Sequence, residues 1–257
     1  MFQSTLPLGE PDLMRVSAFQ RYLDDLVRVG SVDATSTRLS SLSPSLMQDL
    51  ERFERNGQQS ELLDVLAACL RHGYPLTVNL QWTDRVVPLT LFPAERLVHC
   101  PVAMPQFLAS RLSELQVMQV EPAMLRAPGH RDASLVGESQ MYSPLAPLLW
   151  EMALRGARDR LLPEIDGIAA YRVAPGVSLR GLEMPSILGV AIDRLRRRTR
   201  NLRDIASWPG LDRERAMRLL NALYLQGGLI VSRMHPSAAS PDGWLRARQP
   251  RPGASRP

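Results

Sequence analysis

Residues 186–233 read SILGVAIDRLRRRTRNLRDIASWPGLDRERAMRLLNALYLQGGLIVSR, and this stretch has the clearest structural pattern of the chain. Ser186, Asn201 and Asp212 each precede a run of helix-forming residues, and side chains of these three types cap helix N-termini. A Trp-Pro-Gly tripeptide interrupts the second run, and a Gly-Gly pair ends the third before an apolar segment. The stretch therefore predicts three helices followed by a strand.

The second and third of these helices resemble the helix pair of the winged helix-turn-helix superfamily. Ala206 and Gly210 lie four residues apart and match the small helix residue and the turn glycine of that pattern. The resemblance covers about residues 186–246 and implies a recognition helix followed by a wing. The wing strands would be LIVSR, residues 229–233, and GWLRA, residues 243–247.

The same resemblance implies a set of docking residues on the third helix and around it. Its exposed recognition face would hold Arg213, Glu214, Met217, Arg218 and Asn221. In a complex with DNA, Arg213 or Arg218 would read guanine and Asn221 would read adenine. Phosphate contacts would come from further arginines, namely Arg194, Arg196, Arg197, Arg198, Arg200, Arg203, Arg246 and Arg248.

Two features of this stretch argue against DNA. Glu214 stands at the start of the recognition helix, where phosphates would approach. The densest arginines lie at the end of the preceding helix, where they complement the helix dipole without any ligand. Because winged helices also serve as protein-docking modules, docking around Met217 and Leu225 is the first hypothesis, and DNA binding is the alternative.

Charge is distributed unevenly along the chain. All 31 basic residues are arginine, which excludes lysine-dependent chemistry such as Schiff bases and P-loop phosphate binding. Residues 1–193 hold 17 arginines and 22 acidic residues, whereas residues 194–218 hold nine arginines and three acidic residues. We therefore expect an acidic body and a basic module with different partners.

The body has the pattern of an α+β fold in which helices surround a small antiparallel sheet. Residues 76–82 alternate between apolar and polar side chains, as in a half-buried strand, and further strands are expected at residues 86–92 and 96–100. Pro88 indicates an edge or a bulge, and Ser143-Pro144 indicates the start of a helix. We assign residues 1–184 to the body, 185–246 to the winged-helix-like module and 247–257 to a disordered tail. Helices are expected at residues 12–29, 45–56 and 61–72, after Pro105, and from Ser143 to about Arg155.

Elsewhere, the candidates for chemistry are weak. The best candidate zinc ligands are Cys69, His72, His99 and Cys100. However, His99 and Cys100 are adjacent on an expected strand, so their side chains would point to opposite faces and could not easily share an ion. The Gly129–Asp132 segment contains the His-Arg-Asp triplet of protein kinases, but the other kinase motifs are missing from the sequence. Ser139, His130 and Asp132 are the residue types of a hydrolase triad, but nothing in their spacing places them together. Glu164 and Asp166 have the pattern of a solvated turn. We expect no enzyme activity, no metal and no cofactor.

The remaining features bear on location. The N-terminus lacks a basic segment followed by an apolar core, and no apolar run approaches the ~18 residues of a membrane span. Two cysteines are too few for a disulfide framework. The sequence thus predicts a bacterial-type cytoplasmic regulator or adaptor that binds a protein, with double-stranded DNA as the alternative partner and the oligomeric state left open.

Overall fold

A computed structural model describes residues 13–28, 44–55 and 62–238 of the chain. The chain divides into two compact units, residues 1–158 and residues 159–257. This division lies before the expected boundary at residues 184 and 185. The reason is that the strand at Ala170–Val173 pairs with two strands of the second unit, so the segment before residue 185 folds with the module.

The first unit is built on a five-stranded antiparallel sheet, which confirms the α+β class. Its strands are β1 (Leu76–Trp82), β2 (Arg85–Phe92), β3 (Leu97–His99), β4 (Gln116–Pro122) and β5 (Tyr142–Pro144). They are arranged in the order β4-β1-β2-β3-β5, and every neighbouring pair is antiparallel. The alternation in the sequence therefore gives the correct location of the central hairpin.

The register of the sheet explains the position of its proline. Val78 lies opposite Leu89, and both are buried. Thr77 and Asn79, which point to the other face, are buried as well, so most of β1 is buried on both faces and the expected half-buried strand was wrong. Strand β3 pairs with β2 only from Thr90 to Phe92. Pro88 therefore lies where β2 has a paired neighbour on one side only, and its missing N–H leaves the sheet intact.

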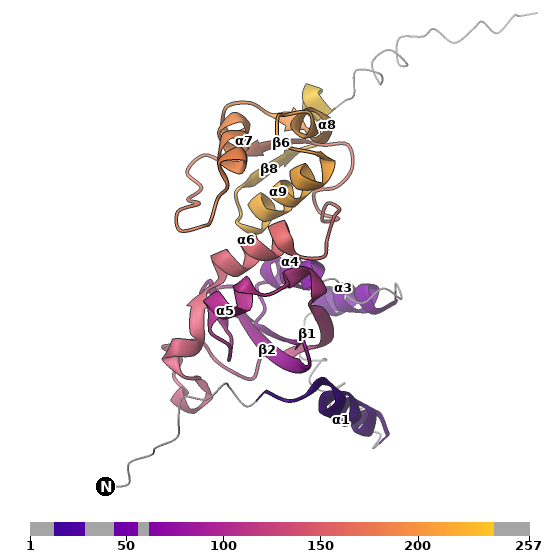
Figure 1. The fold of residues 1–257 in the computed structure, drawn as a ribbon, viewed down its shortest axis with the longest axis vertical. Helices are drawn as coiled ribbons and strands as arrows, with labels where there is room; N and C mark the ends of the chain where they lie inside the picture. Colours follow the sequence, from indigo (N-terminus) through magenta and orange to yellow (C-terminus); the bar gives the residue numbers. More distant parts are fainter. Residues whose placement is uncertain (1–12, 29–43, 56–61, 239–257) are drawn as a thin grey trace, which may run out of the picture. The chain divides into compact units, whose positions relative to one another are not determined.

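Helices gather around this sheet, as Figure 1 shows for α4, α5 and α6 near β1 and β2. Helix α6 begins one residue later than the sequence indicates. The reason is that Ser143 and Pro144 belong to β5. Pro144 is the N-cap residue of α6, and its side chain makes no capping hydrogen bond. The described helices of this unit are α1 (Val16–Arg28), α3 (Pro44–Arg55), α4 (Leu62–His72), α5 (Met104–Ala109) and α6 (Leu145–Arg155), with 3₁₀ turns at Leu112–Glu114, Ala133–Leu135 and Ser139–Met141.

The second unit combines three helices with a short sheet (Figure 1). In chain order its elements are β6 (Ala170–Val173), α7 (Ser186–Arg197), β7 (Arg200–Asn201), α8 (Leu202–Ala206), α9 (Arg213–Leu225), β8 (Leu229–Ser232) and a 3₁₀ turn at Pro236–Ala238. The antiparallel sheet has the order β7-β6-β8. The three helices and the following strand thus lie where the sequence predicts them.

Two of the three expected helix caps are present. Asn201 accepts a hydrogen bond from the Asp204 N–H at 2.8 Å, and Asp212 accepts one from the Arg215 N–H at 2.7 Å. Ser186 is instead the first residue of α7 and Pro185 is its N-cap residue, without a side-chain cap. The prediction for Ser186 was therefore wrong: Pro185, with a non-helical ψ of 141°, occupies the N-cap position, and Ser186 already has a place in the first turn.

The turn before α9 uses the glycine that the resemblance singles out. Gly210 has a φ of +79°, and a Cβ there would approach the Cδ1 of Ile187 to 3.0 Å. Strand β8, however, pairs with β6, which precedes α7 in the chain. The expected second wing strand at residues 243–247 and the tail at 247–257 lie outside the described residues.

Candidate functional site

Helix α9, the expected recognition helix, is largely buried. Asn221 has no exposed surface: its Nδ2 donates to the Arg160 carbonyl at 2.9 Å, and its Oδ1 accepts from the Leu162 N–H at 2.9 Å. The exposure predicted for Asn221 was therefore wrong. A segment that precedes β6 covers this side of the helix, and the amide satisfies two backbone groups of that segment.

The other residues of the expected face are partly used inside the unit. Arg218 is half-buried, and its Nε lies 2.9 Å from the Glu214 Oε1, one helical turn away. This ion pair gives Glu214 a role at the helix start that needs no DNA. Met217 is half-buried and Leu225 is only 3% exposed, so the predicted apolar docking surface around Leu225 was wrong. Arg213 is exposed in the first turn of α9.

Helix α7, in contrast to α9, exposes apolar side chains to solvent on one side. Ile187 and Val190 are 47% and 53% exposed, and Arg194 follows them at helical spacing. The side of the helix that faces the rest of the unit is buried through Ala191, Ile192 and Leu195. We call Ile187, Val190 and Arg194 the outer face of α7. The i, i+3, i+7 spacing of these residues in the sequence places them on one side of a helix. This surface was not predicted, because the resemblance to winged helices directed attention to the third helix.

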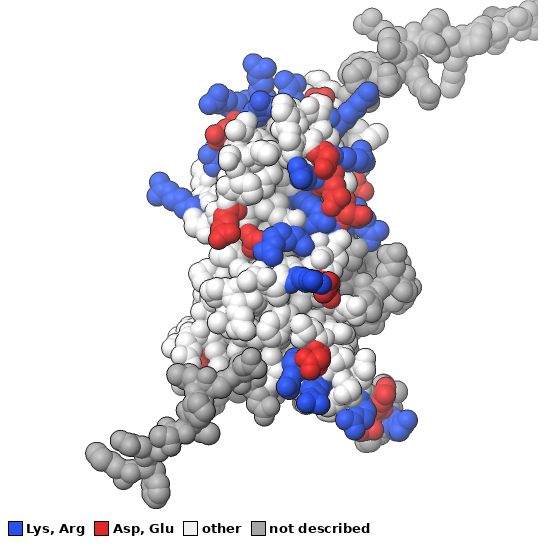
Figure 2. Space-filling view, viewed as in Figure 1, with Lys and Arg blue, Asp and Glu red and all other residues white. Residues whose placement is uncertain are grey.

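The arginines at the end of α7 differ in what they contact. The Arg194 guanidinium carbon lies 5.4 Å from the centre of the Trp208 ring, and Arg200 lies 3.9 Å from the Asp204 carboxylate. Arg197 and Arg198 are exposed and make no ion pair with any described residue. Figure 2 shows arginine side chains gathered over the end of this unit near α7 and α8. This cluster is the strongest feature for a negatively charged partner.

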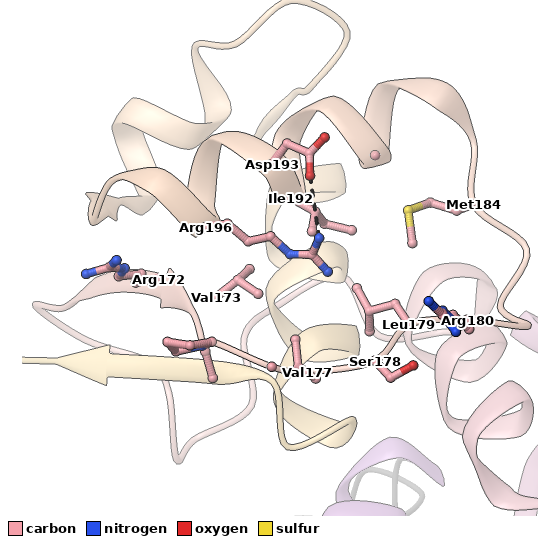
Figure 3. A pocket seen from close by; sticks show the side chains of 14 residues that line it. Arg172, Val173, Val177, Ser178, Leu179, Arg180, Met184, Ile192, Asp193 and Arg196 are labelled. Carbon is pink, nitrogen blue, oxygen red and sulfur yellow. Dashed lines mark ion pairs between the residues drawn. The ribbon is translucent and has the colours of Figure 1, made fainter.

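A pocket of about 940 Å³ lies on the other side of α7, between that helix and the loop after β6. Figure 3 shows its charged residues: Arg172, Arg180, Arg196 and Asp193. Its apolar lining includes Val173, Val177, Leu179, Met184 and Ile192. Arg172 and Arg180 were not predicted from the sequence, because they lie far from the arginine cluster along the chain and it is the packing of β6 against α7 that brings their segment to this helix.

The candidate metal ligands do not come together. No described part of the chain holds three or more histidine, cysteine or acidic residues placed to share an ion. Burial raises the pKa of the Cys69 thiol to about 12 and that of the Cys100 thiol to about 11, which keeps both protonated. His99 is buried against Tyr142, with ring centres 5.0 Å apart, and burial lowers the pKa of its imidazole.

One histidine has a contact that the sequence did not indicate. The His72 Nε2 lies 2.9 Å from the Asp49 Oδ2, and its Nδ1 lies 3.4 Å from the Ser45 Oγ. The residue types are those of a hydrolase triad, but Arg71 also lies 3.5 Å from the same Asp49 oxygen. We interpret the cluster as structural, since it ties α3 to the end of α4.

The loop histidine and aspartate have local roles. The Asp132 Oδ1 accepts hydrogen bonds from the Ser134 N–H at 3.2 Å and the Ser134 Oγ at 2.6 Å. The Asp132 N–H in turn donates to the His130 Nδ1 at 3.1 Å. This carboxylate therefore caps a short turn, and the hydrogen bonds from Ser134 lower its pKa.

Comparison with protein-family models, with curated proteins and with solved structures found no match to this chain. Within the described ranges, none of the helices has both the length and the apolar character needed to cross a bilayer. A function for this chain is therefore inferred from the surfaces of the described residues.

Proposed function

We propose that this protein is a non-enzymatic cytoplasmic adaptor or regulator that docks a protein partner through a winged-helix-like second unit. One observation carries the proposal: Asn221 is buried against the backbone of residues 160 and 162, while α7 exposes Ile187 and Val190. Because α9 is covered on this side, little more than its first turn could enter a DNA groove. The docking surface is therefore the outer face of α7 and not α9.

The outer face of α7 has the composition of a protein interface core. Two branched aliphatic side chains lie next to each other on the helix and are exposed to solvent. A partner that covers them removes apolar surface from water. Arg194 is held over the Trp208 ring, so less rotamer entropy is lost when it pairs across an interface. Arginine and tryptophan are enriched at interface hot spots. We expect a partner with an apolar groove and an acidic rim.

The experiment replaces the apolar pair by charge. The double variant Ile187→Asp/Val190→Asp is compared with Ile168→Asp, a matched control because Ile168 is 75% exposed in a loop of the same unit. Proteins that co-purify with the tagged chain at native expression levels are quantified by mass spectrometry. The proposal expects at least tenfold loss of a specific partner for the double variant and none for the control. Retention of every partner by the double variant contradicts it.

DNA binding is the second candidate, and the unpaired Arg197 and Arg198 are the observation that favours it. A DNA complex would show a log affinity for a duplex that falls steeply with log salt, since phosphate contacts release counterions. Replacing both arginines by alanine would lower that slope by about two. Absence of duplex binding at 50 mM salt rejects this function and leaves the docking proposal standing.

A further inference from the structure

The pocket beside α7 combines an apolar floor with an excess of positive charge. Val173, Leu179 and Ile192 are buried at its base, and three arginines face a single acidic residue at its edge. Asp193 lies 3.7 Å from Arg196, but both side chains are exposed, so this ion pair is weak and Arg196 can still pair with a ligand. Arg172 and Arg180 are exposed and have no ion partner among the described residues. The pocket thus retains charge for an anionic ligand.

The arrangement of the arginines excludes a single small anion as the best fit. In Figure 3 the guanidinium groups of Arg172, Arg196 and Arg180 stand at separate places along the pocket and do not converge on one point. A phosphate site normally gathers several donors around one group. Separated cations with apolar side chains between them suit a ligand that carries several spaced negative charges.

The loop that forms one wall offers main-chain groups as well. The N–H groups of residues 176–180 donate no hydrogen bond to another described residue, whereas the Ala174 N–H just before them donates to the Gly228 carbonyl at 2.9 Å. An extended peptide pairs its own main chain with exposed groups of this kind. Its side chains alternate in direction, so apolar residues enter the floor while acidic residues meet the rim.

From these observations we infer that the pocket binds an extended acidic peptide segment of a protein partner, in which carboxylates alternate with apolar side chains. The site lies on the opposite side of α7 from Ile187 and Val190. It therefore forms a second contact surface, beyond the outer face of α7. Arg196 and Arg180 recognise the acidic side chains, and the partly exposed lining residues Val177 and Met184 contact the apolar ones.

The test is fluorescence anisotropy with the full chain and a labelled peptide of sequence Glu-Leu-Glu-Val-Glu-Leu-Glu. Its matched control peptide has glutamine at every glutamate position. We expect at least tenfold weaker binding of the glutamine peptide. We expect the same loss for the double variant Arg180→Glu/Arg196→Glu, and less than twofold change for Arg213→Glu, which reverses an exposed arginine outside the pocket.

A second variant fills the pocket without changing its charge. Ser178 is exposed and lines the pocket, so Ser178→Trp obstructs it and should weaken the peptide at least fivefold. Circular dichroism checks that each variant is folded. The inference is overturned if the glutamine peptide binds equally well or if Arg213→Glu weakens binding as much as the pocket variants. It also fails if inorganic tripolyphosphate binds the pocket more tightly than the peptide. Since Ile187 and Val190 are unchanged in all of these variants, the result does not depend on the outer face of α7.

Discussion

The first unit buries an arginine in an ion pair, whereas the second exposes two arginines that have none among the described residues. In the first unit Arg158 is buried, with its Nη1 2.6 Å from the Asp64 carboxylate, itself nearly buried. In the second unit Arg197 and Arg198 stand in solvent without an ion partner among the described residues. Residues 1–158 hold 14 arginines against 17 acidic residues, whereas residues 159–257 hold 17 against nine. Net charge alone therefore does not identify a docking surface, since burial and pairing decide which arginines remain available.

The largest effect is expected at the buried pair of the first unit. Arg158→Met leaves the Asp64 carboxylate without its charged partner in a buried place. We expect the free energy of unfolding to fall by about 3–5 kcal/mol, measured by urea denaturation. The double variant Asp64→Leu/Arg158→Met removes both charges and should recover most of that loss. An equal loss in the single and the double variant contradicts a paired role.

A smaller effect is expected in the second unit at Asn221. Asn221→Ala leaves the Leu162 N–H and the Arg160 carbonyl without their partner, at a cost of about 2 kcal/mol. Asn221→Asp keeps the acceptor for the Leu162 N–H but puts a fully buried carboxylate next to the Arg160 carbonyl oxygen, so at neutral pH it should cost at least as much as alanine. If Asn221 faced solvent as a DNA-reading residue, alanine would leave the thermal unfolding midpoint unchanged or raise it, since alanine favours helix.

The pH dependence of stability tests the closed core around His99. Because burial lowers the pKa of His99, the unfolded chain binds its proton first as the pH falls. The free energy of unfolding should therefore decrease below about pH 6.5, with a slope under about 1.4 kcal/mol per pH unit. His99→Phe keeps a ring beside Tyr142 and should remove this slope, whereas His235→Gln should keep it. A slope that persists in His99→Phe rejects the assignment.

The smallest effect is expected at the surface of the second unit. Arg194→Gln removes the cation from the Trp208 ring and should cost about 0.5–1 kcal/mol. Arg197→Gln is the matched control, because no ring or carboxylate contact is found for Arg197 among the described residues, and should stay within 0.5 kcal/mol. Equal thermal unfolding midpoints for the two variants would contradict a stabilising contact between Arg194 and the Trp208 ring.

Much of the fold follows from local sequence signals. The alternation of residues 76–82, the caps Asn201 and Asp212, and the turn at Gly210 all predict what the structure contains. These features depend on neighbours within a few residues. The unit boundary does not, because it is set by the pairing of β6 with β8 across more than fifty residues.

The functional surfaces were harder to predict for the same reason. Asn221 lies where the resemblance to winged helices implies exposure, but a segment sixty residues earlier covers it. No periodicity in α9 reveals that cover. Ile187 and Val190 were visible as apolar residues, and only the burial of Ala191 and Leu195 shows which side of α7 faces solvent. Local capping residues and helix breakers predicted the order of the helices, whereas long-range packing decided which faces are exposed.

The measurement that tests the account most directly is site-specific photo-crosslinking in the native host. A photoreactive amino acid is placed at Val190 on the outer face of α7 and, separately, at Met217 on α9. The account predicts a covalent protein adduct from position 190 and none from position 217. Adducts to protein or DNA from position 217, with none from position 190, would contradict it.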